Sequence, residues 1–516
     1  MKINSLTIKK YNCLNNVAID FSERATILLG ENGSGKSSFI EAICQIFSDL
    51  EHRRHLKLID FDYAINYDCN GHNINIVSIA DELKVKIDGK KSDRKELIKK
   101  DNRDYSPYLP QKIITYTSGV GTNLEEIVED SFRRYKSQLT RSINDVEKYS
   151  TATSVRRFYT IDHKLAGLLL FAVLSDENCQ EKALLKKLMG LNGDLVLNLM
   201  IREKNLSKTN KNFNLQNEAD DFDRQLFFKV ATRIDEEIAK IIYKLWIKNW
   251  VRKDGLFFKL RSKDFRKIDK FRLYHFFETI LNYYEFAYGF MVDYKGKAVS
   301  YKKLSEGQRQ LISVISMIAI FNQRDSLILL DEPDTHLNAK WKRDYWELLR
   351  DVASYSTDSQ VLLSTHDPLM VNGIKKEEVR LFELNNRGNT RVYIPLEDTF
   401  GMGIDGILQS EYYGLLYTVD KSTQEKIDRR RELLIKKENG ELSREELLEY
   451  KGLTEILERT FFTKNMPADN YYDDFLMALQ KIETSKPKKQ LTVEEVRERN
   501  NMILQIVKDL IKNEIH

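Results

Sequence analysis

One eight-residue segment near the N-terminus restricts the possible folds of this 516-residue chain more than any other feature. Residues 30–37 read GENGSGKS and fit the pattern GxxxxGK[ST]. The mostly apolar run Ala25–Leu29 precedes them as a buried strand would, and Ser37–Phe47 carries apolar residues at helical spacing. A strand, a glycine-rich loop and a helix in this order predict an α/β domain with a phosphate-binding loop.

The residue types in this loop suit the binding of nucleotide phosphates and Mg²⁺. Glycines let backbone N–H groups wrap the phosphates, Lys36 can reach the β- and γ-phosphates, and the Ser37 hydroxyl can hold Mg²⁺ at the helix N-terminus. A plain glycine-rich turn is the alternative, and the complete pattern in its required context argues against it. The predicted nucleotide-binding residues of the loop are Gly30, Asn32, Gly33, Ser34, Gly35, Lys36, Ser37 and Ser38.

A second predicted strand supplies two carboxylates. The apolar run Leu327–Leu330 ends in Asp331 and Glu332. We predict that Asp331, with Ser37, is a ligand in the Mg²⁺ shell and that Glu332 is the general base that polarises the attacking water. A strand that ends in Asp-Glu is ordinary by itself, so this assignment depends on the phosphate-binding loop.

A third segment, residues 304–310, reads LSEGQRQ and precedes a predicted helix. The N–H groups at the start of that helix, together with the Ser305 hydroxyl, can face the γ-phosphate of a nucleotide bound by another subunit. Ser305, Gly307 and Gln308 are therefore predicted to complete a composite nucleotide site. A plain helix cap would have the same residues, but its place just upstream of the carboxylate strand favours the composite site.

His366 is predicted to be the second catalytic residue, in contact with the γ-phosphate. It follows the apolar run Val361–Ser364. A lone histidine at a strand end is usually structural, so the assignment depends on the order of the motifs along the chain. His336, in the segment 333–337, is not assigned to the site, because a capping or packing role explains it as well. Gln111 precedes the strand-like run Ile113–Tyr116 instead of following it, and is left out of the predicted site.

Composition and patterning divide the chain into four segments. Residues 1–120 are predicted to form the N-terminal lobe of the α/β nucleotide-binding domain, here called the head. This lobe opens with a hairpin that turns at Asn15–Asn16. Residues 121–295, rich in charged and aromatic residues with few Gly or Pro, are predicted to be a helical insertion without long coiled-coil heptads. Residues 296–400 form the C-terminal lobe, and 401–516 a helical module that docks a partner.

Overall charge and cysteine content exclude several kinds of site. Lys and Arg (82) barely exceed Asp and Glu (78), so a nucleic-acid surface for DNA or RNA would have to be local. The cysteines form no CxxC pair, which suggests neither a zinc site nor a disulfide framework. No run of about 18 apolar residues occurs, so we expect a cytoplasmic protein without a membrane span.

The tail carries two predicted helix-capping boxes, Ser443 with Glu446 and Thr492 with Glu495. Its apolar stripes must be buried somewhere, and for 443–462 packing on the head explains them as well as docking does. The last helix, being terminal, is the predicted docking element. The first stripe is Leu447, Leu448, Leu453 and Leu457, and the second is Ile503, Ile506, Val507 and Leu510.

Together, the segments GENGSGKSS, LSEGQRQL, LILLDEPDTHLN and LLSTHD resemble ABC/SMC-type ATPases of prokaryotic defence, and among them the PtuA subunits of Septu anti-phage systems, including those attached to retrons. The likeness covers about 1–120 and 300–400, and GIDGILQS at 403–410 also resembles that group. It implies an ABC-type P-loop ATPase head, with a mixed sheet and flanking helices, that uses ATP and Mg²⁺.

The resemblance also implies partners. It implies a homodimer around ATP, or a higher oligomer of such dimers, and an HNH nuclease similar to PtuB that the ATPase controls. A reverse transcriptase and its RNA–DNA product would join them if the protein is attached to a retron.

Other functions remain open at this point. An SMC-like ATPase for DNA repair or DNA-end sensing, without a nuclease partner, is the main alternative. A transporter head is disfavoured, because such heads have a short segment where this chain runs from Ser37 to Leu304. A related family carries a Toprim nuclease after the head, but Asp473-Asp474 lacks the further glutamate-bearing strand of a two-metal site, so we expect no nuclease site in this chain.

Overall fold

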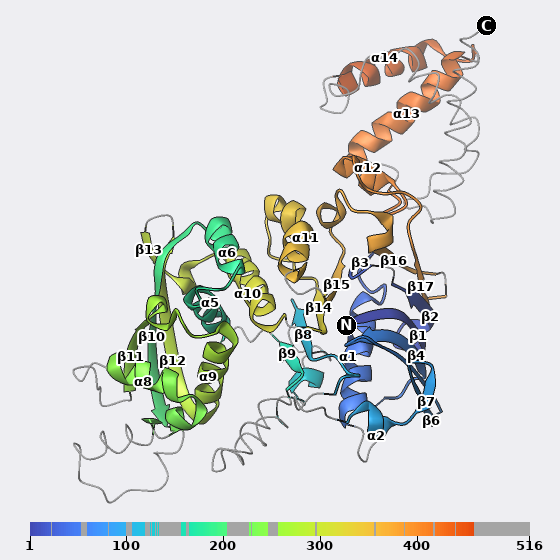
Figure 1. Cartoon of the computed structure of the whole chain (residues 1–516). Helices are drawn as coiled ribbons and strands as arrows, with labels where there is room; N and C mark the ends of the chain where they lie inside the picture. Colours follow the sequence, from blue (N-terminus) through green and yellow to red (C-terminus); the bar gives the residue numbers. More distant parts are fainter. Residues whose placement is uncertain are drawn as a thin grey trace, which may run out of the picture. The chain divides into compact units, whose positions relative to one another are not determined.

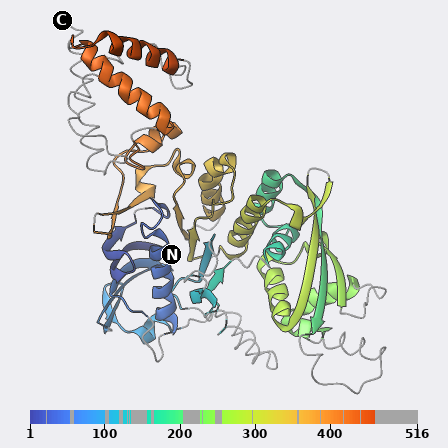
Figure 2. The ribbon, with the colours of Figure 1, turned by 180° about the vertical axis from the view of Figure 1, so that it is seen from behind.

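The computed structural model separates into two compact units, Met1–Leu396 and Glu397–His516 (Figures 1 and 2). Met1–Leu396 is the first unit and Glu397–His516 is the second unit. The structure describes residues 1–21, 23–52, 59–80, 82–99, 106–118, parts of 124–133, 156–160, 165–203, most of 227–245, 256–294, 297–322, 324–354, 358–385, 387–415, 418–438 and 440–458.

A seven-stranded, mostly parallel sheet positions the predicted site in the first unit. Its strand order is β17-β16-β3-β15-β14-β8-β9, and only the pair β16–β17 is antiparallel. The strands are β3 (Ala25–Gly30), β8 (Lys112–Thr117), β9 (Phe158–Thr160), β14 (Ser326–Asp331), β15 (Gln360–Thr365), β16 (Val379–Leu384) and β17 (Thr390–Tyr393). All residues of β14 and β15 are buried, which explains their apolar sequences.

Helices flank this sheet, so the predicted α/β fold class with a mixed sheet is confirmed. Helix α1 (Lys36–His52) follows β3, and α11 (Ala339–Ser354) connects the parallel neighbours β14 and β15. Helix α10 (Glu306–Phe321) precedes β14. Because the carboxyl ends of parallel strands meet at one edge, the residues that follow β3, β14 and β15 come together there.

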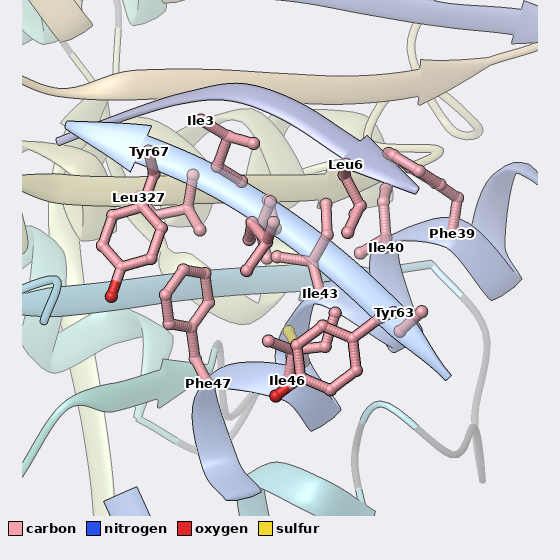
Figure 3. Packing of buried hydrophobic residues seen from close by; sticks show 14 of the residues in the cluster. Ile3, Leu6, Phe39, Ile40, Ile43, Ile46, Phe47, Tyr63, Tyr67 and Leu327 are labelled. Atoms are coloured by element: carbon pink, nitrogen blue, oxygen red, sulfur yellow. The ribbon is translucent and has the colours of Figure 1, made fainter. Parts of the chain in front are cut away.

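A six-stranded antiparallel sheet lies over α1, with the order β2-β1-β4-β5-β6-β7. Its strands are β1 (Lys2–Tyr11), β2 (Leu14–Asp20), β4 (Tyr63–Cys69), β5 (His72–Ile79), β6 (Glu82–Ile87) and β7 (Lys90–Ser92), and α2 (Arg94–Leu97) follows them. One buried core joins α1 to both sheets, with Ile3 and Tyr67 from the antiparallel sheet, Ile43 and Phe47 from α1, and Leu327 from β14 (Figure 3).

The opening hairpin is present, but its turn was placed wrongly. Tyr11 pairs with Leu14, so the turn consists of Asn12 and Cys13 instead of the predicted Asn15–Asn16. Asn12 supplies the left-handed backbone (φ 51°) that a two-residue turn requires and that asparagine tolerates better than most residues.

The prediction of a helical insertion at 121–295 was wrong in part, because the described residues of this segment form strands as well as helices. Beside α5 (Ala166–Ser175), α6 (Glu181–Met189), α8 (Glu236–Leu245) and α9 (Lys270–Tyr283), the region contributes to a four-stranded antiparallel sheet of order β11-β10-β12-β13. These strands are β10 (Leu191–Glu203), β11 (Leu256–Arg261), β12 (Tyr284–Tyr294) and β13 (Lys297–Ser300). In β10, Leu195, Leu197 and Leu199 alternate as buried residues, a period of two that the high charge of the surrounding sequence obscured.

The second unit is helical in its described part, as expected, with α12 (Ile404–Gln409), α13 (Lys421–Glu438) and α14 (Arg444–Glu458). Arg429 of α13 pairs with Glu449 of α14 at 2.9 Å. The Ser443–Glu446 capping box is confirmed by reciprocal bonds of 3.0 and 3.1 Å. The predicted second box, the last apolar stripe and Asp473-Asp474 lie outside the described residues.

The first predicted apolar stripe of the tail is divided in the structure. Leu457 is 4% exposed, whereas Leu448 on the same helix is 68% exposed.

Short 3-10 helices lie at Ser262–Phe265, Tyr301–Lys303, Pro368–Val371 and Lys376–Glu378. Among the described residues, no helix combines the length and apolarity needed to cross a membrane.

Candidate nucleotide site

The phosphate-binding loop leaves β3 at Gly30 and enters α1 at Lys36. Gly33 and Gly35 adopt left-handed backbone conformations, with φ of 81° and 100°. A side chain at Gly35 would be strained by this φ and would also place its Cβ 2.8 Å from Thr390 Oγ1. Glycine is therefore required here. A glycine-rich loop that enters a helix N-terminus can present backbone N–H groups to an anion.

The Lys36 side chain lies inside the loop. Its ammonium donates to the carbonyl oxygens of Gly30 at 2.8 Å and Glu31 at 2.9 Å, and the residue is 4% exposed. Burial lowers the pKa of Lys36, while the carboxylates of Glu332 and Asp331 act in the opposite direction. A buried cation beside a turn of backbone N–H groups is a favourable partner for phosphate.

Ser37 and Asp331 form the predicted metal-binding pair. The Ser37 hydroxyl donates to Asp331 Oδ1 at 3.0 Å, and the Ser364 hydroxyl donates to the same oxygen. Burial raises the pKa of Asp331, and these two hydrogen bonds oppose the rise. A hydroxyl and a carboxylate at a helix N-terminus are hard oxygen donors of the kind that Mg²⁺ prefers.

Glu332 and His366, the two predicted catalytic residues, are in contact. His366 Nδ1 lies 2.9 Å from Glu332 Oε1. The backbone of Glu332 has φ 48°, which is uncommon outside glycine, and its N–H donates to the Ser364 carbonyl at 3.1 Å. The strained conformation directs the Glu332 side chain toward the residue that follows β15.

The signature residues (Ser305, Gly307 and Gln308) form a second cluster at the start of α10. The Ser305 hydroxyl accepts from Gln308 N at 3.3 Å, and Ser305 N donates to Gln308 Oε1 at 2.9 Å, which is a capping box. A Cβ on Gly307 would lie 2.3 Å from the His336 carbonyl oxygen, so glycine permits α10 to approach the 333–337 loop. His336 itself faces Glu306 at 3.6 Å.

Gln111 lies at the other end of the sheet. It precedes β8, where its N–H donates to the Asp325 carbonyl at 3.0 Å. Since β8 and β14 are parallel and Thr117 stands opposite Asp331, Gln111 is at the edge opposite the carboxylates. This position agrees with its omission from the predicted site.

Two residues that sequence motifs did not reveal, Thr390 and Asn12, are bonded to the phosphate-binding loop. The Thr390 hydroxyl donates to the Ser34 carbonyl at 2.8 Å, and Thr390 N donates to the Cys13 carbonyl at 3.1 Å. Asn12 Nδ2 donates to the Ser38 hydroxyl at 3.2 Å. Hydrogen bonds from β17 and from the turn between β1 and β2 thus hold the phosphate-binding loop in place.

Replacing Thr390 with valine should weaken ATP binding about fivefold, because one hydrogen bond to the loop is worth about 1 kcal/mol. Thr390→Ser keeps the hydroxyl and is the matched control, with affinity close to that of the parent protein. Fluorescence titration with a labelled ATP analogue measures both variants. Equal affinity in Thr390→Val and Thr390→Ser would show that this bond does not hold the loop.

Comparisons with known proteins agree with the geometry. The chain is 27% identical over 164 residues to Septu protein PtuA of Bacillus mycoides (strain KBAB4), an alignment that covers 30% of this chain and 23% of PtuA. It is 22% identical over 441 residues to the Retron Vc95 probable ATPase of Vibrio cholerae serotype O1 biovar El Tor, which covers 78% of this chain and 77% of that protein. The expected resemblance to PtuA and retron ATPases is confirmed.

A comparison with solved structures matches the SMC head domain from Thermotoga maritima, with a TM-score of 0.34 at 12% identity over 76% of this chain and 99% of that one. The recombination mediator protein RecF with ATP gives a TM-score of 0.32 at 12% identity, over 76% and 99% of the two chains. The family model described as AAA ATPase domain matches residues 1–371. This protein therefore belongs to the AAA ATPase domain family.

Proposed function

We propose that this protein binds and hydrolyses Mg-ATP as the regulatory subunit of an anti-phage defence complex. The observation that supports ATP hydrolysis best is the convergence of Lys36, the Ser37–Asp331 pair and the Glu332–His366 pair at one edge of the sheet. The names of the relatives, a Septu protein and a retron ATPase, support a role in defence.

The loop residues fit a triphosphate. Lys36 neutralises phosphate charge, and the N–H groups exposed by the bends at Gly33 and Gly35 bind phosphate oxygens. Ser34 is 1% exposed, and its hydroxyl has no hydrogen-bond partner among the described residues, so a polar group at this loop would satisfy it.

Ser37 and Asp331 would hold Mg²⁺, which supplies Lewis-acid neutralisation of phosphate charge when bound. In the proposed reaction Glu332 accepts a proton from the attacking water. His366 orients the Glu332 carboxylate through their 2.9 Å contact and faces the γ-phosphate.

We further propose that two copies enclose ATP. The Ser305 hydroxyl and the N–H groups at the start of α10 lie at a helix N-terminus, which favours an anion presented by another subunit. Lys36→Ala and Ser305→Arg chains should each be inactive alone. Mixed together, they should regain ATPase activity from at most one intact composite site in each heterodimer.

Size-exclusion chromatography with light scattering, in the presence of ATP, measures assembly in the same samples. Complete recovery of activity in the mixture, no recovery at all, or a strict monomer with ATP would each contradict the composite site.

The partner that we propose is an HNH nuclease, docked through the second unit and controlled by the nucleotide state. The protein encoded beside this chain is purified in complex with Glu332→Gln chains, which represent the ATP-bound state, and with Lys36→Ala chains, which represent the ATP-free state. Their nuclease rates on plasmid DNA should differ, and equal rates would contradict control by ATP. Truncation after Gln490 should retain ATPase activity and lose the partner, whereas loss of ATPase activity would favour packing of the tail on the head.

An SMC-like ATPase for DNA repair or end sensing is the second candidate. It predicts ATP-dependent binding of DNA ends by the purified chain without any partner. Under the first proposal, the chain alone leaves DNA intact in the presence of Mg²⁺ and ATP, because the nuclease site belongs to the partner.

A further inference from the structure

A partly buried polar cluster lies beside the Glu332–His366 pair and has no part in the proposed chemistry. Its members are Asp334 of the 333–337 loop, Thr365 at the end of β15, Asp367, and Lys342 of α11. Lys342 Nζ lies 2.5 Å from Asp367 Oδ2 and 3.9 Å from Asp334 Oδ2. The lysine therefore bridges the two segments that carry the catalytic pair.

Thr365 connects these segments a second time, on both sides of His366. Its hydroxyl donates to Asp334 Oδ2 at 3.1 Å and accepts from Asp367 N at 3.0 Å. The segments after β14 and β15 are thus joined twice, by Glu332 with His366 and by Asp334 with Thr365. The second connection fixes the backbone from which the His366 side chain projects.

The Asp334 carboxyl is costly to bury. The residue is 2% exposed, and its Oδ1 has no hydrogen-bond partner among the described residues. Burial, reinforced by Asp367, raises the pKa of Asp334 to about 6, against Lys342 and the hydrogen bond from Thr365. A buried carboxyl with one oxygen lacking a hydrogen bond lowers the stability of the fold. We therefore expect Asp334 to contribute to activity instead of stability.

The same loop also contacts α10. Gln310 Nε2 donates to the Pro333 carbonyl at 2.7 Å, and Gly307 lies directly against the His336 carbonyl. Helix α10 therefore contacts the 333–337 loop on either side of Asp334. A shift of α10 would reach Thr365 and His366 through this residue.

We propose that Asp334 is a positioning residue for ATP hydrolysis, which holds Thr365 directly and Asp367 through Lys342, and so fixes His366 against Glu332. Asp334 also carries the position of α10 to His366. The inference rests on the proposed ATPase activity and adds a residue that acts through the catalytic pair.

Replacing Asp334 with asparagine should lower kcat roughly 10- to 100-fold, because small misplacements of catalytic groups have effects of this size. The KM for ATP should stay within about twofold, since Asp334 is not placed in contact with the nucleotide. The melting temperature should hold or rise, because a buried charge is removed. Asp344→Asn, at an exposed position of α11, is the matched control and should behave as the parent protein.

A double-mutant cycle separates positioning from general damage. In a His366→Ala background, Asp334→Asn should cause no further loss of kcat, because its effect passes through His366. Full additivity of the two losses, or a parental kcat in Asp334→Asn, would overturn the inference. An inactive parent protein would instead refute the proposed ATPase function, on which the inference rests.

Lys342→Met provides the same test if Asp334→Asn does not fold. It should lower kcat without changing ATP binding, whereas Lys340→Met, exposed on the same helix, should not. A Lys342→Met enzyme with parental kcat would contradict the role of the bridge.

Discussion

Glu332→Gln should leave ATP bound and slow its turnover by roughly 10²- to 10⁴-fold, the range expected for loss of a general base. The amide keeps the size and shape of the carboxylate, so the contact with His366 and the unusual backbone of residue 332 can persist. It cannot accept a proton from the attacking water. ATP affinity and single-turnover hydrolysis, measured on the same preparation, separate the two effects.

Glu347→Gln, an exposed change on α11, controls for the loss of one carboxylate. If Glu332→Gln turned over ATP at the parental rate, Glu332 would have no place in the mechanism. If it lost ATP binding as well, the residue would hold the nucleotide instead of activating water. The variant should also accumulate an ATP-bound dimer, which light scattering detects.

Lys36→Ala should lower ATP affinity by roughly 10- to 150-fold, as expected for charge-assisted hydrogen bonds worth about 1.5–3 kcal/mol. Its ammonium is buried among carbonyl oxygens of the loop, so its removal should not lower the melting temperature without nucleotide. The stabilisation that ATP gives to the parent protein should require correspondingly higher ATP concentrations in the variant. A thermal-shift titration with ATP measures both quantities.

Lys340→Ala, exposed on α11, is the control for the loss of a lysine and should keep the full ATP response. An unchanged response in Lys36→Ala would remove this lysine from nucleotide binding. A melting temperature far below that of the parent without ATP would show that Lys36 supports the fold of the loop.

Sequence patterns predicted the parts of the site that follow mostly apolar strands. The runs before Gly30, Asp331 and His366 are buried neighbours in one parallel sheet, so local hydrophobicity was sufficient to locate them. Contacts between distant segments left no such pattern. Thr390 reaches Ser34 across 356 residues, and the role of Asp334 depends on a lysine from α11.

The error in 121–295 has a different cause. Strands β10 and β12 interrupt a region whose remaining sequence is charged and has helical periodicity, so its composition favoured helix throughout. The alternation within β10 is the signal that would have corrected the prediction. The misplaced hairpin turn arose similarly, because several asparagines compete for the turn and only the pairing of Tyr11 with Leu14 selects Asn12.

The attachment of β17 to the phosphate-binding loop has a mechanical consequence. Tension on the second unit travels along the polypeptide through Leu396 into β17, whose first residue, Thr390, is bonded to the Ser34 carbonyl. Strand β16 pairs with β17 along its whole length, so β17 is held in the sheet. We therefore expect a displacement of the chain at Leu396 to reach the Ser34 carbonyl of the phosphate-binding loop through β17 and Thr390.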